Sequence, residues 1–220
     1  FTSDTQGWAV GPTGTILTTI NGGINWTAQT SGTVSTLNIV RFTSATRGWI
    51  VGNTGTILTT TNGGSTWTAQ ISGSTSNVSD IYAVSSTQLY AVGTNGTVWI
   101  TSDGGNNWAP TAYGSFNTLN NVYFTSATQG WTVGTVGIVY TTNNSGATWL
   151  RQPTNTTNAL NGIHFASATQ GWAVGAAGTI VATTNGGTTW TAQTSGTASQ
   201  LNGVYFTSAT QGWAVGINGT

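Results

Sequence analysis

The sequence predicts an all-β fold, and two observations support that prediction: the amino-acid composition and a strict internal repeat. Thr, Ser, Asn and Gly dominate the 220 residues, whereas Lys, Glu and Met are absent. Threonine and aromatic residues favour strands, while Asn and Gly favour turns. No stretch shows the hydrophobic period of an amphipathic helix. Eleven Trp, six Tyr and six Phe supply bulky side chains for a core.

The repeat has a period of 41 residues, kept without insertion or deletion by two aromatic series. The first is Trp26, Trp67, Trp108, Trp149 and Trp190, and the second is Trp8, Trp49, Tyr90, Trp131, Trp172 and Trp213. A period near 40 with several short strands per unit is typical of a propeller blade. We therefore predict a single domain over residues 1–220. It is a five-bladed β-propeller of 41-residue, four-stranded repeats, followed by an overlap in which 206–220 is equivalent to 1–15.

Each repeat is predicted to contain four strands. First strands are expected at 37–42, 79–83, 119–124, 160–165 and 201–206, and second strands at 7–11, 48–52, 89–93, 130–134, 171–175 and 212–216. Third strands are expected at 14–19, 55–60, 96–101, 137–142 and 178–183, each followed by a short fourth strand such as 66–70. Asn-Gly-Gly triplets between the third and fourth strands supply the positive φ angles of tight hairpins.

The duplicated ends predict how the first blade closes. Strand 201–206 is expected to complete the sheet formed by 7–11, 14–19 and 25–30, because ring closure removes exposed sheet edges. Segments 7–11 and 212–216 then compete for one place beside it. We expect either copy to be able to occupy that place, with the other disordered or paired with another molecule.

The hairpin sequences carry a resemblance to known repeats. "TTNGGSTWT" (60–68) and "TSDGGNNWA" (101–109) resemble the Asp-box hairpin of bacterial neuraminidase-type (BNR) repeats. Together with "FTSATQGWAVG", they make the unit similar to the propeller repeat of photosystem II stability/assembly factors and their secreted bacterial relatives. The resemblance covers the whole chain and implies a propeller. It implies little about function, because such propellers serve as enzymes, chaperones and surface modules.

Charge and residue inventory exclude several classes of function. Three Arg and three Asp are the only charged side chains, so we expect no nucleic-acid partner and no membrane insertion. There is no Cys and only one His, so we expect no metal site and no cofactor. Asp4, Asp80 and Asp103 occupy unrelated positions and Glu is absent, which predicts no paired-carboxylate glycosidase chemistry and no enzyme. The hydroxyl- and amide-rich surface favours an extracellular or cell-surface protein of bacterial type.

Two sets of residues are candidates for binding. The first occupies one position of the inner strands and is expected around the channel mouth: Arg41, Tyr82, Tyr123, His164 and Tyr205. The alternative is that these side chains pack between blades and satisfy backbone groups. The second set lies in the linkers that follow the fourth strands. These linkers vary between repeats and share a face with the second-to-third-strand turns, so Tyr113 and Phe116 mark a candidate interaction face.

The functional prediction is a non-catalytic binding or structural scaffold that holds a protein or a glycan. One alternative is a self-assembling surface or fibre subunit, a homo-oligomer that uses the duplicated terminal strand. A second is a designed or recently amplified propeller with no selected ligand. The two periodic aromatic series are expected to form the core, and Trp99, outside both series, is the Trp expected to behave differently.

Overall fold

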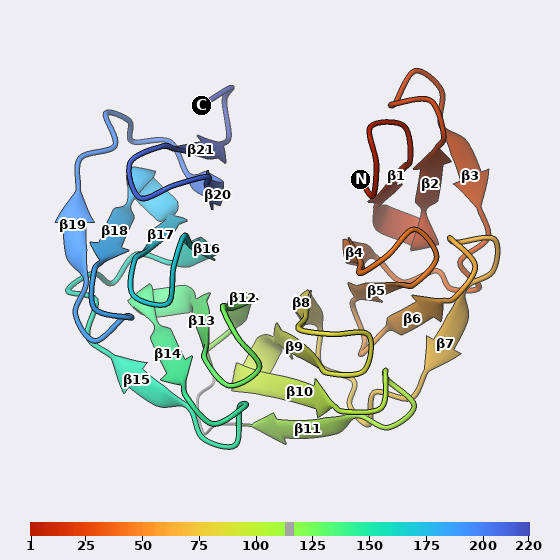
Figure 1. The fold of residues 1–220 in the computed structure, drawn as a ribbon, viewed down its shortest axis with the longest axis horizontal. Coiled ribbons are helices and arrows are strands. Elements are labelled where there is room, and N and C mark those ends of the chain that lie inside the picture. Colours follow the sequence, from red (N-terminus) through yellow and green to blue (C-terminus); the bar gives the residue numbers. More distant parts are fainter. Residues whose placement is uncertain (113–116) are drawn as a thin grey trace. The chain divides into compact units, whose positions relative to one another are not determined.

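The computed structural model describes residues 1–112 and 117–220 and divides into two compact units, Phe1–Ala112 and Tyr113–Thr220 (Figure 1). Within the described residues, each unit consists of antiparallel sheets joined by turns, and its only helical segments are 3-10 turns of three residues. The predicted all-β class is therefore confirmed.

The first unit contains one three-stranded and two four-stranded sheets, each in chain order. The three-stranded sheet is β1 (Gly7–Val10), β2 (Ile16–Thr19) and β3 (Thr27–Gln29). The next is β4 (Leu37–Phe42), β5 (Gly48–Gly52), β6 (Ile57–Thr60) and β7 (Thr68–Gln70). The third is β8 (Val78–Ala83), β9 (Leu89–Gly93), β10 (Thr97–Thr101) and β11 (Ala109–Ala112).

The second unit contains two four-stranded sheets and a two-stranded one. The first is β12 (Leu119–Phe124), β13 (Gly130–Gly134), β14 (Val139–Thr142) and β15 (Leu150–Gln152). The second is β16 (Leu160–Phe165), β17 (Gly171–Gly175), β18 (Ile180–Thr183) and β19 (Thr191–Gln193). The last pairs β20 (Leu201–Phe206) with β21 (Gly212–Gly216). Within each unit the first strands of successive sheets lie side by side, as β4 does with β8 and β16 with β20.

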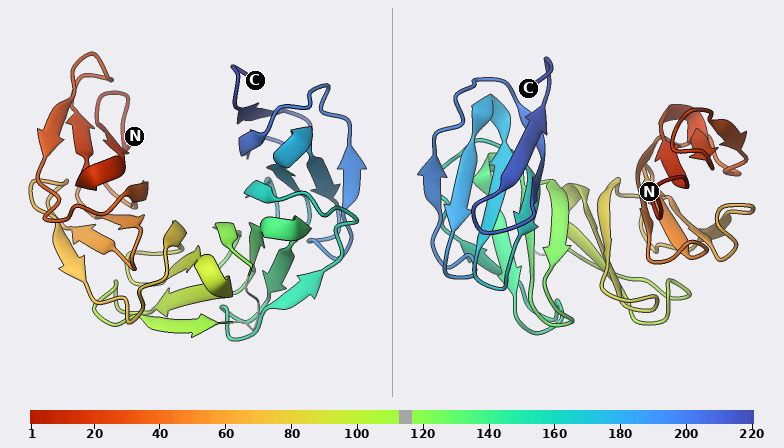
Figure 2. Two further views of the ribbon diagram at one scale, coloured as in Figure 1. Left: turned by 180° about the vertical axis from the view of Figure 1, so that it is seen from behind. Right: turned by 45° about the horizontal axis from the view of Figure 1, so that its top comes forward.

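Most third strands begin two residues later than predicted because a glycine turn precedes them. Four of these turns are 3-10 turns: η1 (Pro12–Gly14), η2 (Thr94–Gly96), η3 (Thr135–Gly137) and η4 (Ala176–Gly178). In each unit they lie on the same side of the sheets (Figure 2). Gly137 has φ +67°, and a Cβ there would lie 1.9 Å from the carbonyl oxygen of Thr156. A side chain is therefore excluded by both conformation and space.

The two aromatic series form most of the core, as predicted. Tyr90, Trp49 and Trp131 are fully buried, and Trp8, Trp108, Trp149, Trp172 and Trp190 are at most 8 % exposed. Indole rings from second strands stack on the phenylalanine of the next first strand, as Trp131 does on Phe165 at 3.6 Å. Trp99 is also fully buried. It lies outside the two series in sequence position, but it is a core residue like most of their members.

Two members of the series, one in the first and one in the last repeat, are more exposed than the others. Trp213 is 54 % exposed and Trp26 is 38 % exposed. The reason is that each indole needs an adjacent repeat to cover it. Trp172 has that neighbour, because its ring stacks on Phe206 at 3.5 Å.

Of the two segments expected to compete for the place beside strand 201–206, the C-terminal copy occupies it. Strand β20 pairs with β21 through a register that runs from Leu201–Gly216 to Phe206–Gly212. Within the first unit, the sheet that begins with β1 has three strands. A short connection tethers β21 directly to β20, so local hairpin pairing has a lower loop-closure cost than pairing with a segment about 200 residues away.

Candidate functional site

In the first unit, the inner-strand candidates are Arg41 and Tyr82, and Arg41 forms an ion pair. The Arg41 guanidinium on β4 lies 3.6 Å from the Asp80 carboxylate on β8, and the two side chains are 50 % and 1 % exposed. Burial raises the pKa of Tyr82 on the same strand, while the charge of Arg41 opposes that shift. Arg41 and Asp80 both fall on predicted inner strands, but their pairing was not predicted. The available signal was that one Arg and one Asp occur on successive inner strands.

In the second unit, Tyr123, His164 and Tyr205 from β12, β16 and β20 form a row of aromatic rings. The ring centroids are 5.0 Å apart for Tyr123 and His164 and 4.7 Å apart for His164 and Tyr205. The Tyr123 hydroxyl donates a hydrogen bond to the Phe165 carbonyl at 3.1 Å and lies 3.5 Å from His164 Nε2. Tyr205 is the open end of the row, with 58 % of its surface exposed.

The hydrogen bonds of His164 fix its tautomer. The backbone N–H of Phe206 donates to His164 Nδ1 at 3.3 Å, so Nδ1 carries no proton and the neutral ring is protonated at Nε2. Burial lowers the pKa of His164, which favours this neutral form. His164 therefore connects β16 to β20 and satisfies a backbone donor, in line with the packing alternative for this residue.

Asparagines three residues before the candidate positions also hold the inner strands together. Asn38 donates from Nδ2 to the Val78 carbonyl at 2.8 Å, and Asn161 does the same to the Leu201 carbonyl at 2.9 Å. These amides satisfy backbone acceptors of the next repeat. Neighbouring repeats in each unit are thus joined by side-chain hydrogen bonds as well as by aromatic packing.

The linkers and turns meet on one face of each unit, as the sequence analysis expected. The backbone N–H of Asn53 donates to the Thr36 carbonyl, and Thr94 donates to the Asn77 carbonyl, at 2.9 and 3.0 Å. Exposed apolar side chains occur on this face, for example Val34 at 88 %. Tyr113 and Phe116, the aromatic residues expected there, lie outside the described residues.

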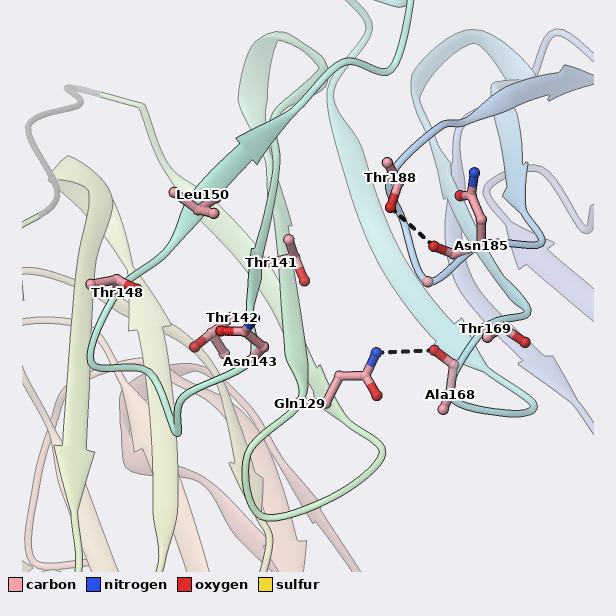
Figure 3. A pocket seen from close by; sticks show the side chains of 11 residues that line it. Gln129, Thr141, Thr142, Asn143, Thr148, Leu150, Ala168, Thr169, Asn185 and Thr188 are labelled. Atoms are coloured by element: carbon pink, nitrogen blue, oxygen red, sulfur yellow. Dashed lines mark hydrogen bonds between the residues drawn. The ribbon is translucent and has the colours of Figure 1, made fainter.

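A pocket that the sequence analysis missed lies at the opposite turns of the second unit (Figure 3). Its volume is about 350 Å³, and hydroxyl and amide side chains from two neighbouring repeats predominate in its lining. Gln129 crosses between these repeats and donates to the Ala168 carbonyl at 3.1 Å. None of the lining residues is charged. Because these hairpins scarcely vary between repeats, their sequences gave no indication of a site.

The three acidic residues are separated by structure as well as by sequence. Asp80 is in the ion pair, Asp4 is exposed in a loop, and Asp103 is part of a hairpin. Hydrogen bonds from Asn107, and then from Thr101, lower the pKa of Asp103 to about 2. Asp103 thus takes the turn-stabilising place that Asn occupies in the other repeats. Among the residues that the structure describes, no three His, Cys, Asp or Glu side chains group into a metal site.

Repeating antiparallel sheets joined by aromatic stacks define a propeller-type repeat protein. Residues 1–76 and 113–191 match the family described as the photosynthesis system II assembly factor YCF48. This match covers more than half of the chain. The chain therefore belongs to the YCF48 family, which confirms the resemblance inferred from its repeats.

Solved structures show the same fold. YCF48 from Cyanidioschyzon merolae is 18 % identical with a TM-score of 0.77, and the alignment covers 97 % of this chain and 77 % of that one. A structure of YCF48 bound to D1 peptide is 22 % identical with a TM-score of 0.54, covering 100 % and 89 %. The GH74 enzyme from Niastella koreensis is 17 % identical with a TM-score of 0.68, covering 83 % and 34 %. No curated protein matches the chain.

The family match corrects the expected location. The hydroxyl-rich, weakly charged surface favoured an extracellular or cell-surface protein, and that expectation is wrong, because the family is that of a photosystem II assembly factor and not of a secreted surface protein. Low charge limits electrostatic partners but does not specify a compartment. Within residues 1–112 and 117–220, no helix is long and apolar enough to cross a membrane.

Proposed function

We propose that this protein is a non-catalytic scaffold that binds a segment of a partner protein through its inner strands. The observation that carries the proposal is membership of an assembly-factor family, together with a structural relative that was solved with a D1 peptide. The paired-carboxylate chemistry of glycosidases has no counterpart in the described residues, since the three Asp lie on separate elements. The GH74 structures share the fold alone.

The inner-strand residues offer two kinds of contact to a peptide. Arg41 keeps half of its side chain exposed beside Asp80, so its remaining N–H donors are free to bind a peptide carboxylate or carbonyl. Tyr205 presents an exposed ring and hydroxyl at the end of the aromatic row, a surface suited to stacking and hydrogen bonding. These residues lie in different units, and each contact is proposed separately.

Fluorescence anisotropy with a labelled D1 peptide tests the proposal. We expect saturable binding that Arg41→Gln or Tyr205→Ala weakens severalfold. Arg151→Gln is the matched control for charge, because Arg151 is exposed on β15 away from the inner strands. Absence of binding would contradict the proposal and would favour the alternative of a propeller with no selected ligand. Binding that Arg151→Gln weakens as much as Arg41→Gln would contradict the inner-strand site.

The linker face is a second candidate for the same role. Main-chain hydrogen bonds hold linkers and turns together there, and Val34 and Val136 are 88 % and 49 % exposed. If peptide binding uses this face of the first or of the second unit, Val34→Ser or Val136→Ser respectively weakens it and the inner-strand variants do not. The same anisotropy measurement therefore distinguishes the two surfaces.

A further inference from the structure

A pocket between two repeats of the second unit has a chemistry that the proposed function does not use (Figure 3). It is the pocket of about 350 Å³ at the turns opposite the linkers, called the hairpin pocket below. Its lining comes from β14, β15 and neighbouring loops, and no residue of the inner strands β12 and β16 contributes. A ligand held here does not need the inner-strand residues.

The walls of the hairpin pocket are held by hydrogen bonds of their own. Gln129 donates from Nε2 to the Ala168 carbonyl at 3.1 Å, which joins the two repeats. The Thr142 hydroxyl on β14 accepts from the Gly146 N–H at 2.9 Å and fixes the first hairpin. These contacts lie within the protein, so the pocket is formed before a ligand binds and little ordering is needed on binding.

Two amides in the lining have unused hydrogen-bonding capacity. Among the residues that the structure describes, none hydrogen-bonds to the exposed side chain of Asn143, and Gln129 leaves its Oε1 without a partner there. An amide side chain both donates and accepts hydrogen bonds. Leu150, 63 % exposed, adds an apolar surface to the same lining, and none of the lining residues is charged. The pocket thus offers neutral donors and acceptors beside an apolar surface.

Asn143 and Leu150 are departures from the repeat. At the position of Asn143 the other repeats have Ile20, Thr61, Ser102 and Thr184. At the position of Leu150 they have Thr27, Thr68, Ala109 and Thr191. The free amide and the apolar surface are therefore particular to this hairpin and are not needed for the propeller fold.

The corresponding positions of the first unit are charged. Arg47 stands where the pocket has Gln129, and Asp103 stands where it has Asn185. A charge that a neutral ligand covers loses its water without gaining an opposite charge, which is unfavourable. Neutral ligands are therefore expected at the pocket of the second unit and not at these positions of the first.

We propose that the hairpin pocket binds a neutral sugar. The sugar hydroxyls exchange hydrogen bonds with the Asn143 amide and the Gln129 Oε1, and the C–H face of the sugar ring packs on Leu150. A hydroxyl both donates and accepts, so it matches a lining that offers both. The volume of about 350 Å³ is at the lower end of the range of about 300–1,000 Å³ for ligand sites, which suits a ligand of one or two sugar rings.

Nuclear magnetic resonance titration of isotope-labelled protein tests the site, because the side-chain amides of Asn and Gln give signals of their own. The probes are glucose and galactose, together with their charged counterparts glucuronate and galacturonate. We expect saturable shifts of the Asn143 and Gln129 side-chain signals with at least one of the two neutral sugars. Its charged counterpart should bind severalfold more weakly, because the pocket lining holds no opposite charge for the carboxylate.

Two variants and a matched control place the sugar in the pocket. Asn143→Thr and Leu150→Thr introduce residues that other repeats have at these positions, so each is expected to fold and to bind the sugar severalfold more weakly. Asn158→Ser is the control, because it removes an exposed amide at the linker face of the same unit and introduces the residue found at Ser35 and Ser76. This variant should bind the sugar like the unmodified protein.

Each other outcome overturns the proposal. Absence of a saturable shift with both neutral sugars shows that the pocket does not hold this class of ligand. Equal binding by Asn143→Thr, Leu150→Thr and the unmodified protein places the sugar elsewhere. Binding of a charged counterpart as tight as that of its neutral sugar contradicts a neutral site. Shifts of the two amide signals with the D1 peptide and with neither sugar assign the pocket to the peptide.

Discussion

Replacing Trp131 by alanine should destabilise the protein far more than the same change at Trp213, although both occupy one position of the repeat. Trp131 is fully buried, stacks on Phe165 at 3.6 Å and donates to the Gly186 carbonyl at 2.9 Å. Truncating a buried tryptophan costs about 3–5 kcal/mol. Trp213 is 54 % exposed, and substitutions at exposed sites usually change stability by less than about 0.5 kcal/mol. Urea denaturation followed by circular dichroism, at low protein concentration, measures the free energy of unfolding of both variants.

An intermediate variant separates the contributions at Trp131. Trp131→Phe keeps an aromatic ring for the stack but removes the indole donor, and an unmade buried hydrogen bond costs about 1–3 kcal/mol. Its loss of stability should therefore lie between that of Trp131→Ala and that of the unmodified protein. If Trp131→Ala and Trp213→Ala lowered stability equally, packing between repeats would not account for the periodic tryptophans, and the reasoning would fail.

Three further predictions concern backbone, charge and catalysis. Gly137→Ala should destabilise the protein by more than Gly196→Ala. The φ angle is positive at both positions, but only at Gly137 would a Cβ collide with the carbonyl of the neighbouring linker. Thermal melts compare the two variants, and an equal decrease in melting temperature would contradict the clash. The pKa of Asp103 is lowered from 3.8 to about 2, so the ionised carboxylate contributes to folding stability above pH 3.8, and this contribution is lost as the pH falls through 2. In Asp103→Asn the melting temperature should therefore depend less on pH between 3.8 and 2. A pH profile of the melting temperature equal to that of the unmodified protein would exclude this role. Fluorogenic sialidase and glycosidase substrates should release no sugar above a blank; turnover lost on substitution of Asp4, Asp80 or Asp103 would refute the non-catalytic proposal.

The repeat made most of the fold predictable from sequence. Nine of the eleven predicted first and second strands, such as 37–42 and 48–52, have the predicted bounds, because aromatic and β-branched residues recur there at fixed spacing. The third strands were predicted too long. Their leading glycines read as strand continuations in the sequence, yet they adopt positive φ against the linker backbone.

Strand partners, ion pairs and side-chain exposure could not be predicted from the sequence, because they depend on which residues are neighbours in space. Identical motifs at 7–11 and 212–216 give no indication of which partner each selects, since strand pairing depends on the connection to the adjacent strand. The ion pair of Arg41 with Asp80 depends on the offset between neighbouring first strands, which the 41-residue period does not specify. The exposure of Trp26 and Trp213 likewise depends on a neighbouring repeat and not on the motif.

The way the linkers are held has a practical consequence for protein engineering. Linker 30–36 is fixed at its end by main-chain hydrogen bonds to the turns on both sides, from Gly14 to the Ser35 carbonyl and from Asn53 to the Thr36 carbonyl. Linker 71–77 is held in the same way by Gly55 and Thr94. These main-chain bonds involve no side chain of Val34 or Ile71, which are 88 % and 86 % exposed, so both side chains are open to randomisation without loss of loop geometry. The exposed positions Val34 and Ile71 are therefore suitable for a combinatorial display library, whereas the buried Ser31 and Ser72, whose hydroxyl groups donate to the carbonyls of Thr33 and Ser74, should be kept.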